Sequence, residues 1–424
     1  MNNIKQKNRW LIALSAVAIH ICIGSVYAWS VYTKPIQAEM GWTLTDVTTT
    51  FSIAIFFLGL SAALMGKFVE EKGPRFAASL AAILFGLGTI GSGFAIMIES
   101  KLALYLAYGV LGGCGLGIGY ISPVSTLVKW FPDRRGMGVG MAIMGFGFAS
   151  AISGPAINIL IELYGVSSTF IILGVTYFII MISAAQYLAP PEKDFLPEKF
   201  KLHLEAGTKK IKEDLSNLTR EESLKTGRFY GLWLMLFINV TCGIAIIGVS
   251  SPLLQEITGM TALAAAAAVG IMGIFNGAGR IIWASLSDYL TRPVVYMIFF
   301  STQILAFYFL PVVSNVILFQ IMIFYIMTCY GGGFASIPAY IGDIFGTKQL
   351  GAIHGYILTA WAMAGLAGPI IIAYVKDTTG SYSSTLYVFA GLLSIGLIIS
   401  IAMMFNIKKI RHQKNAKLET NLYS

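Results

Sequence analysis

Arg280 is the one basic residue that falls well inside an apolar segment of the sequence. It precedes Asp288, at the polar end of that segment, by eight residues, a depth of about 12 Å along a helix. No Asp or Glu lies deep in any apolar segment. A guanidinium buried in a membrane needs an anionic partner or a water-filled cavity, and it binds carboxylates through paired hydrogen bonds. We therefore expect Arg280 to bind a substrate carboxylate; the alternative is an arginine that snorkels or bonds to carbonyls.

Three further polar residues of the apolar segments could take part in the same chemistry. Asn276 precedes Arg280 by one helical turn, so both project from one face, and its amide could contact a second substrate oxygen or bond another helix. His20 and His354 titrate near neutrality and could relay a proton, although buried histidines are more often neutral and hydrogen-bonded. A proton could instead enter with the substrate near Arg280.

The composition predicts a membrane protein. The 424 residues are 56% hydrophobic and only 12% charged, about half the charge of a soluble domain. The net charge of +9 does not indicate nucleic-acid binding, because the basic residues lie between apolar blocks. The four cysteines lie in apolar segments at no metal-type spacing, so neither disulfides, metal nor a cofactor is expected. No enzyme or nucleotide-binding motif is present, and we expect no enzymatic activity.

Twelve blocks have the length and apolarity of a membrane-spanning helix. They cover residues 10–33, 47–68, 76–98, 102–128, 137–161, 167–189, 230–254, 262–286, 293–313, 315–341, 351–374 and 382–407. Hydrocarbon offers no partner to an open strand edge, and the blocks lack the alternation of barrel strands. The sequence therefore predicts an all-α membrane protein with twelve transmembrane helices.

The distribution of basic residues predicts the orientation. With a cytoplasmic N-terminus, 25 of the 29 Lys and Arg residues lie in inner loops or termini and three in outer loops, as the positive-inside rule requires. Both termini are then cytoplasmic. The chain divides into a six-helix bundle (1–189), a cytoplasmic central loop (190–229), a second six-helix bundle (230–407) and a cytoplasmic tail (408–424).

The two halves carry matching motifs in the same order. Residues 35–41 (PIQAEMG) resemble residues 252–259 (PLLQEITG), and Gly154-Pro155 matches Gly368-Pro369. Repeats of this kind are typical of transporters built from two parallel six-helix halves. We therefore expect two pseudo-symmetric bundles.

The loop after the second span, residues 66–75 (GKFVEEKGPR), resembles the signature loop of the major facilitator superfamily. Glu70 stands where that family usually has aspartate, and a weaker second copy contains Asp288 and Arg292. Acidic and basic residues there could pair across the cytoplasmic face in one conformation and separate in the other. We expect Glu70, Arg75, Asp288 and Arg292 to act in gating; the alternative is a set of ordinary anchoring charges.

The chain is similar, nearly end to end, to the oxalate/formate antiporter family of carboxylate transporters. The matching stretches are residues 24–30 (GSVYAWS), 129–136 (KWFPDRRG), 224–230 (LKTGRFY), 275–280 (FNGAGR) and 342–346 (GDIFG). This resemblance places the substrate-binding arginine on Arg280. It also implies that Tyr27, Tyr120, Tyr330 and Phe334 are aromatic pocket residues.

Trp361 departs from the family pattern. Oxalate-exchanging members of the family carry a lysine at this place, and a second cation suits a dianion. A single cation suits a monoanion, because an uncompensated buried charge is costly. We therefore expect a monocarboxylate of the lactate, pyruvate or formate type, and we expect Trp361 to line the site.

The expected function is secondary active transport of a small monocarboxylate by alternating access, coupled to protons. Carboxylate exchange of the oxalate/formate type is the alternative, and a non-transporting membrane sensor is a reading from another class. The expected partners are the substrate, protons and the lipid bilayer of the cell membrane, with the protein a monomer.

Overall fold

The computed structural model describes residues 7–131, 135–192, 215–313, 315–346 and 349–422. At some positions within these ranges, mainly near one end of the bundle, only the backbone is described. Every regular element of the described ranges is helical, which confirms the predicted all-α class.

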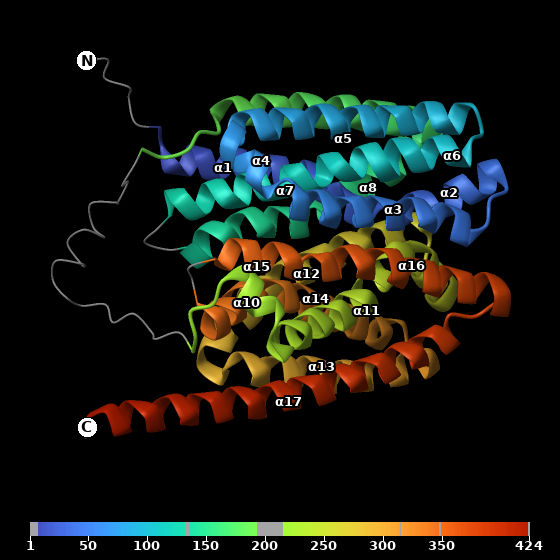
Figure 1. The fold of residues 1–424 in the computed structure, drawn as a ribbon. Helices are drawn as coiled ribbons and strands as arrows, with labels where there is room; N and C mark the ends of the chain where they lie inside the picture. The colour runs from blue at the N-terminus through green and yellow to red at the C-terminus, as the bar shows by residue number, and fades with distance from the viewer. Residues whose placement is uncertain (1–6, 132–134, 193–214, 314, 347–348, 423–424) are drawn as a thin grey trace, which may run out of the picture.

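Figure 1 shows two layers of helices, blue to green above and yellow to red below. The first layer holds the N-terminal elements: α1 (Arg9–Gly24), η1 (Ser25–Ala28), α2 (Ser30–Met40), α3 (Leu44–Leu64), α4 (Gly66–Lys72), α5 (Pro74–Met97), α6 (Lys101–Leu104), η2 (Tyr105–Gly112), α7 (Gly113–Trp130) and α8 (Arg135–Tyr187). The second holds the C-terminal elements: α10 (Arg220–Leu224), α11 (Gly227–Thr258), α12 (Ala262–Leu290), α13 (Arg292–Phe309), η3 (Leu310–Val312), α14 (Val316–Phe345), α15 (Leu350–Ile357), α16 (Thr359–Thr379) and α17 (Ser383–Leu422).

Eleven stretches of the described residues are long and apolar enough to cross a membrane. One of them, Ile143–Tyr187 in α8, contains the fifth and sixth predicted spans. Gly165 divides it, with a non-helical φ of 79° that a residue without Cβ adopts freely. The structure thus contains the predicted spans, with two of them joined at a tight turn.

The helices differ from the predicted spans in three places. The first span is interrupted by the 3₁₀ turn η1 and continues as α2 to Met40. The fourth contains the π-helical stretch η2, and α17 runs beyond residue 407 to Leu422. Long apolar runs locate a span, but they do not report such interruptions.

The repeated motif of the two halves ends a helix in the same way each time. Helix α2 contains Pro35 and ends at Gly41, and α11 contains Pro252 and ends at Gly259. Both glycines are left-handed, with φ of 67° and 68°, and each N–H bonds the carbonyl four residues before it. Threonine caps the helix that follows in both halves, Thr43 before α3 and Thr261 before α12.

The two halves contact each other through small residues. A Cβ at Gly147 of α8 would lie 2.9 Å from Gly277 Cα of α12, and one at Gly59 of α3 would lie 2.8 Å from Ala362 Cβ of α16. Close approach of this kind is the usual mode of helix packing in lipid, where burial of apolar surface does not drive association. The α8–α12 and α3–α16 contacts therefore set the distance between the halves.

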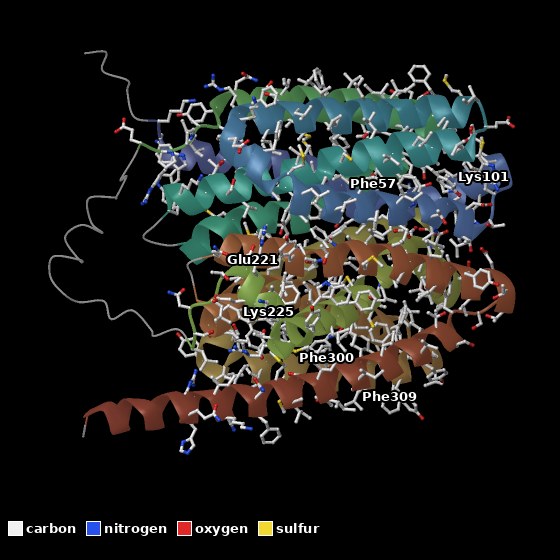
Figure 2. All side chains as sticks on the ribbon, in the orientation of Figure 1. Phe57, Lys101, Glu221, Lys225, Phe300 and Phe309 are labelled. Carbon is white, nitrogen blue, oxygen red and sulfur yellow. The ribbon has the colours of Figure 1, made fainter. Side chains whose placement is uncertain are left out.

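Helix α1 begins and α17 ends at the same end of the bundle (Figure 1). Figure 2 shows Lys101 at the opposite end, whereas Glu221 of α10 and Lys225, which follows that helix, lie toward the end that holds the termini. A chain that crosses the membrane an even number of times has both termini on the same side, which is what this arrangement shows.

Candidate functional site

Arg280 lies in α12 at the contact between the halves and is 4% exposed. Its Nε donates to Asn276 Oδ1 over 3.0 Å, one turn earlier on the same helix. Its Nη1 and the Nδ2 of Asn276 are buried, with no hydrogen-bond partner among the described residues. No acidic side chain contacts the guanidinium in the described structure. The two side chains thus project from the same face of α12, as the spacing of the two residues in the sequence predicts.

Six aromatic side chains form a closed loop of ring contacts beside Arg280; we call them the aromatic box. The neighbouring ring centroids are 4.7–6.2 Å apart, in the order Tyr27, Tyr330, Phe334, Trp361, Tyr120, Phe146 and back to Tyr27. The guanidinium carbon of Arg280 lies 5.5 Å from the Phe334 centroid. Arg280 also interacts electrostatically with the tyrosine hydroxyls of the box.

The box joins both halves of the protein. Tyr27, Tyr120 and Phe146 come from η1, α7 and α8, whereas Tyr330 and Phe334 come from α14 and Trp361 from α16. The hydroxyls of Tyr27 and Tyr330 are 2.7 Å apart and form a hydrogen bond between the halves. A second such bond joins Ser30 to Ser250 at 2.9 Å. The structure therefore brings together the four aromatic residues that the family resemblance indicated, and Trp361 lies with them.

The close packing of α1 against α8 positions Tyr27 in the aromatic box. A Cβ at Gly24 would overlap the backbone of Phe146, so only glycine lets α1 approach α8 this closely. The 3₁₀ turn η1 follows directly, and Ser25 Oγ bonds the carbonyl of Cys22 at 2.7 Å. This tightened turn carries Tyr27, which is 2% exposed.

Phe146 is the site residue that the sequence analysis did not identify. It is fully buried and contacts Tyr27, Tyr120, Trp361 and His20. It stands between Gly145 and Gly147, which pack against α1 and α12. A large residue flanked by glycines in a glycine-rich span was the available signal, because close packing on both sides leaves it in the interface.

Trp361 contributes a neutral donor to the box. It is 1% exposed and lies against Tyr120 and Phe334, with centroid distances of 5.5 and 4.7 Å. Its Nε1 is buried and has no partner in the described structure. The side chains around the site therefore offer three unpaired donors, on Arg280, Asn276 and Trp361, and only the first is charged.

The two histidines lie in different surroundings. His20 is fully buried, its ring 5.5 Å from that of Tyr120, and it interacts electrostatically with Arg280. Its Nδ1 is 3.0 Å from the Ala16 carbonyl, which can only accept. In the neutral ring, Nδ1 therefore carries the proton and the buried Nε2 is an unpartnered acceptor. His354 lies in α15 and makes no contact with the aromatic box among the described contacts.

The charges expected to act in gating are only partly described. The side chains of Glu70 and Asp288 lie outside the described residues. Arg75 is exposed. Arg292 is 8% exposed and its Nε lies 3.5 Å from Asp343 Oδ2 at the end of α14. This described ion pair of Arg292 lies within the C-terminal half.

Comparison with known proteins places the chain among membrane transporters. The model of the Major Facilitator Superfamily matches residues 13–369 and, in a second match, 232–421. The oxalate:formate antiporter of Oxalobacter formigenes is 27% identical, over 88% of this chain and 86% of that protein. Apicoplast pyruvate carrier 1 of Toxoplasma gondii is 22% identical, over 89% and 86%. Monocarboxylate transporter 12 of Xenopus laevis is 27% identical, over 78% and 74%.

The fold has solved counterparts. An inward-facing, unoccupied bacterial homologue of the human lysosomal transporter Spinster superposes with a TM-score of 0.69. The match covers 95% of this chain and 97% of that one at 14% identity. At this level of identity the comparison supports the arrangement of helices and says nothing about the substrate.

Proposed function

The chain belongs to the major facilitator superfamily, and we propose that it transports a small monocarboxylate across the cell membrane by alternating access. The observation that carries this proposal is the buried Nη1 of Arg280, which has no hydrogen-bond partner in the described structure. A buried guanidinium without an anion is costly. A substrate carboxylate would supply both the charge and the acceptors.

The charge of the site favours a monoanion. Arg280 is the only cationic side chain that contacts the aromatic box in the described structure. A second carboxylate would face neutral donors and aromatic walls, which compensate a full charge poorly. The unpaired donors of Asn276 and Trp361 would instead suit a hydroxyl or keto oxygen. The names of the relatives, which include a pyruvate carrier and monocarboxylate transporters, support this substrate class.

Alternating access follows from where the site lies. Arg280 and half of the aromatic box belong to the C-terminal half, and the remaining rings belong to the N-terminal half. Rocking of one half against the other would open the site to one side of the membrane at a time. The Tyr27–Tyr330 hydrogen bond would break and re-form in each cycle.

Coupling to protons is the further part of the proposal. His20 is the better placed of the two histidines, because its Nε2 is an unpartnered acceptor and Arg280 lies nearby. A proton on Nε2 would be repelled by empty Arg280 and stabilised by a bound carboxylate, which links the two events. Exchange of one carboxylate for another remains the second candidate, because the first relative named above is an antiporter.

The orientation and assembly complete the proposal. We place both termini in the cytoplasm, because most of the basic residues, Lys5, Lys7 and Arg9 among them, lie in the loops and termini on that side of the membrane. The substrate site is complete within one chain, so a monomer suffices for transport.

The test is uptake into liposomes that hold the purified protein. Labelled lactate, pyruvate, formate, acetate and oxalate are offered with and without an inward proton gradient, to the wild type and to Arg280→Ala. We expect a monocarboxylate to accumulate with the gradient. The variant should lose at least about thirtyfold in uptake, since removing one partner of a buried charge pair costs about 2–5 kcal/mol.

Arg228→Ala is the matched control. Arg228 is also partly buried, but it stacks on Phe345 outside the aromatic box, with its guanidinium carbon 5.5 Å from the ring centroid. Its loss should leave uptake near the wild-type rate. Oxalate moving best, and only against a loaded counter-substrate, would replace the proposal by exchange. Unchanged uptake in Arg280→Ala would refute the site itself.

A further inference from the structure

Three consecutive glycines, Gly331–Gly333, separate Tyr330 from Phe334 on α14. Each glycine faces a different neighbour: a Cβ at Gly331 would overlap Asn276 of α12, one at Gly332 would meet Trp283 and Phe299, and one at Gly333 would overlap Asn239 of α11. The glycine run is thus enclosed by α11, α12 and α13. Close approach at Gly331 is what brings α14 against the part of α12 that carries Asn276 and Arg280.

The same run is a weak point of α14. Glycine lowers the stiffness of a helix. Pro338 has no N–H to bond the carbonyl of Phe334, and its ring crowds that carbonyl. A helix with these features can bend in more than one direction. Something outside α14 must therefore select the direction, because Tyr330 and Phe334 hold defined places in the aromatic box.

Two buried polar side chains, one from α11 and one from α13, bond the backbone of α14 at this run, and a third from α13 bonds one of the two. Asn239 Nδ2 donates to the Cys329 carbonyl over 3.3 Å, and the Tyr296 hydroxyl donates to the Gly333 carbonyl over 2.7 Å. Gln303 Nε2 donates to Asn239 Oδ1 over 3.0 Å and so orients the asparagine. All three side chains are fully buried. The two carbonyls lie on α14 just before the run and at its end.

We propose that Tyr296, Asn239 and Gln303 are positioning residues of the substrate site. They hold the bend and rotation of α14 at Gly331–Gly333, and α14 in turn places Tyr330 against Tyr27 and Phe334 against Arg280. In the described structure none of the three makes a hydrogen bond or a ring contact with Arg280 or the aromatic box. The inference rests on the proposed function, because the placed residues are those that would surround the carboxylate.

The test compares two tyrosine variants of the same helix pair. Tyr296→Phe removes the hydroxyl that bonds the Gly333 carbonyl. Tyr325→Phe removes a hydroxyl that bonds Thr302 Oγ1 at 2.6 Å, also between α13 and α14 but away from the glycine run. Each variant loses one hydrogen bond, so similar changes in thermal stability are expected. Carboxylate affinity and maximal rate are measured in liposomes, and amide exchange of the α14 peptides is measured by mass spectrometry.

We expect Tyr296→Phe to raise the substrate KM about threefold to tenfold, the equivalent of one net hydrogen bond, with a smaller effect on the maximal rate. The amides around Gly331–Gly333 should exchange faster in this variant. Tyr325→Phe should keep the wild-type KM and exchange. If Tyr296→Phe does not fold, Gln303→Met, which keeps the volume and frees Asn239, should raise the KM and the exchange in the same direction.

Equal KM values and equal exchange in the two tyrosine variants would overturn the inference. A wild-type protein that moves no carboxylate would instead refute the proposed function. The exchange measurement needs no substrate, so it tests the hold on α14 in that case as well. Faster exchange at the run with an unchanged KM would show that the three residues stabilise α14 without positioning the site, which contradicts the proposal.

Discussion

For single residues, the proposed recognition of a monocarboxylate depends on the charge of Arg280 and on the neutral side chain of Trp361. Arg280 would offer the charge, and Trp361 occupies the position at which the family resemblance implies a second cation in oxalate-exchanging members. In the structure the indole closes the aromatic box between Tyr120 and Phe334. Its Nε1 is unpaired in the described structure and can still donate to a neutral oxygen. The charge at this one position should therefore select between monoanions and dianions.

We predict that Trp361→Lys shifts transport from monocarboxylates toward oxalate. The added ammonium would pair with a second carboxylate, whereas a monoanion would leave it buried without a partner. The ratio of oxalate to lactate uptake in liposomes should rise by roughly tenfold or more, the equivalent of about 1.4 kcal/mol. Trp361→Phe, which keeps an aromatic wall and adds no charge, should leave the ratio unchanged. A rise in the ratio with phenylalanine would mean that size, not charge, sets the selectivity.

At the scale of elements, the end of α14 is held by the segment before α10. Leu215 N–H donates to the Asp343 carbonyl and Leu218 N–H to the Phe345 carbonyl, over 3.0 and 2.8 Å. Ser216 Oγ donates to the Ile344 carbonyl over 2.5 Å. The last carbonyls of a helix have no partner within it, so this segment completes the C-terminus of α14. Arg292 adds an ion pair to Asp343 at the same place.

We expect Ser216→Ala to lower the stability of the folded protein by about 1 kcal/mol, because it removes the bond to a helix-terminal carbonyl. Thermal unfolding in detergent measures this change. Ser394→Ala is the control: Ser394 Oγ bonds the Ala390 carbonyl of its own helix, over 3.0 Å, so its loss should shift the transition less. Equal shifts would mean that the segment contributes no more to α14 than an ordinary intrahelical serine does to its own helix.

At the scale of the whole molecule, a contact between the halves lies at the end of the bundle opposite the termini. The carboxylate of Asp377, near the end of α16, accepts from Thr45 N–H over 2.8 Å and from Thr45 Oγ1 over 2.5 Å. Thr45 stands in the first turn of α3, where the helix favours an anion. The neighbouring pair of Lys101 and Asp46 is 2.8 Å apart and lies within the N-terminal half.

We predict that Asp377→Ala favours the conformation in which the halves separate at this end. Two hydrogen bonds to a carboxylate would be lost, and the population of that conformation should rise about fivefold to tenfold. The reporter of this conformation is Ser250→Cys, in a background with the four native cysteines replaced. Ser250 bonds Ser30 of the other half, so a cysteine there becomes accessible when the halves separate. A membrane-impermeant maleimide added from outside should label this cysteine faster in the Asp377 variant. Lys101→Ala breaks a contact within one half and should leave labelling unchanged; equal labelling in both variants would contradict the prediction.

The amino-acid sequence was enough to predict the membrane class, the spans and the residue at the centre of the candidate site. Spans can be located in the sequence because crossing the hydrocarbon core requires about 20 apolar residues in a row. Arg280 can be identified because a charged residue inside such a run is energetically costly. The pairing of Asn276 with Arg280 followed from the helical period. The aromatic residues other than Phe146 came from the family resemblance, since 54 aromatic side chains are too many to sort by composition.

Which of these residues contact one another depends on the tertiary structure and could not be predicted from the sequence. It placed Phe146 in the aromatic box and His20 beside Tyr120, and it set His354 apart in α15. It also connected Tyr296 and Asn239 to the backbone of α14 at the glycine run, across 37 and 90 residues of sequence, with Gln303 bonded to Asn239. Such contacts depend on how two six-helix halves cross, and the crossing is set by small residues whose partners lie on other helices. The sequence of one apolar span does not show which other helix its glycines pack against.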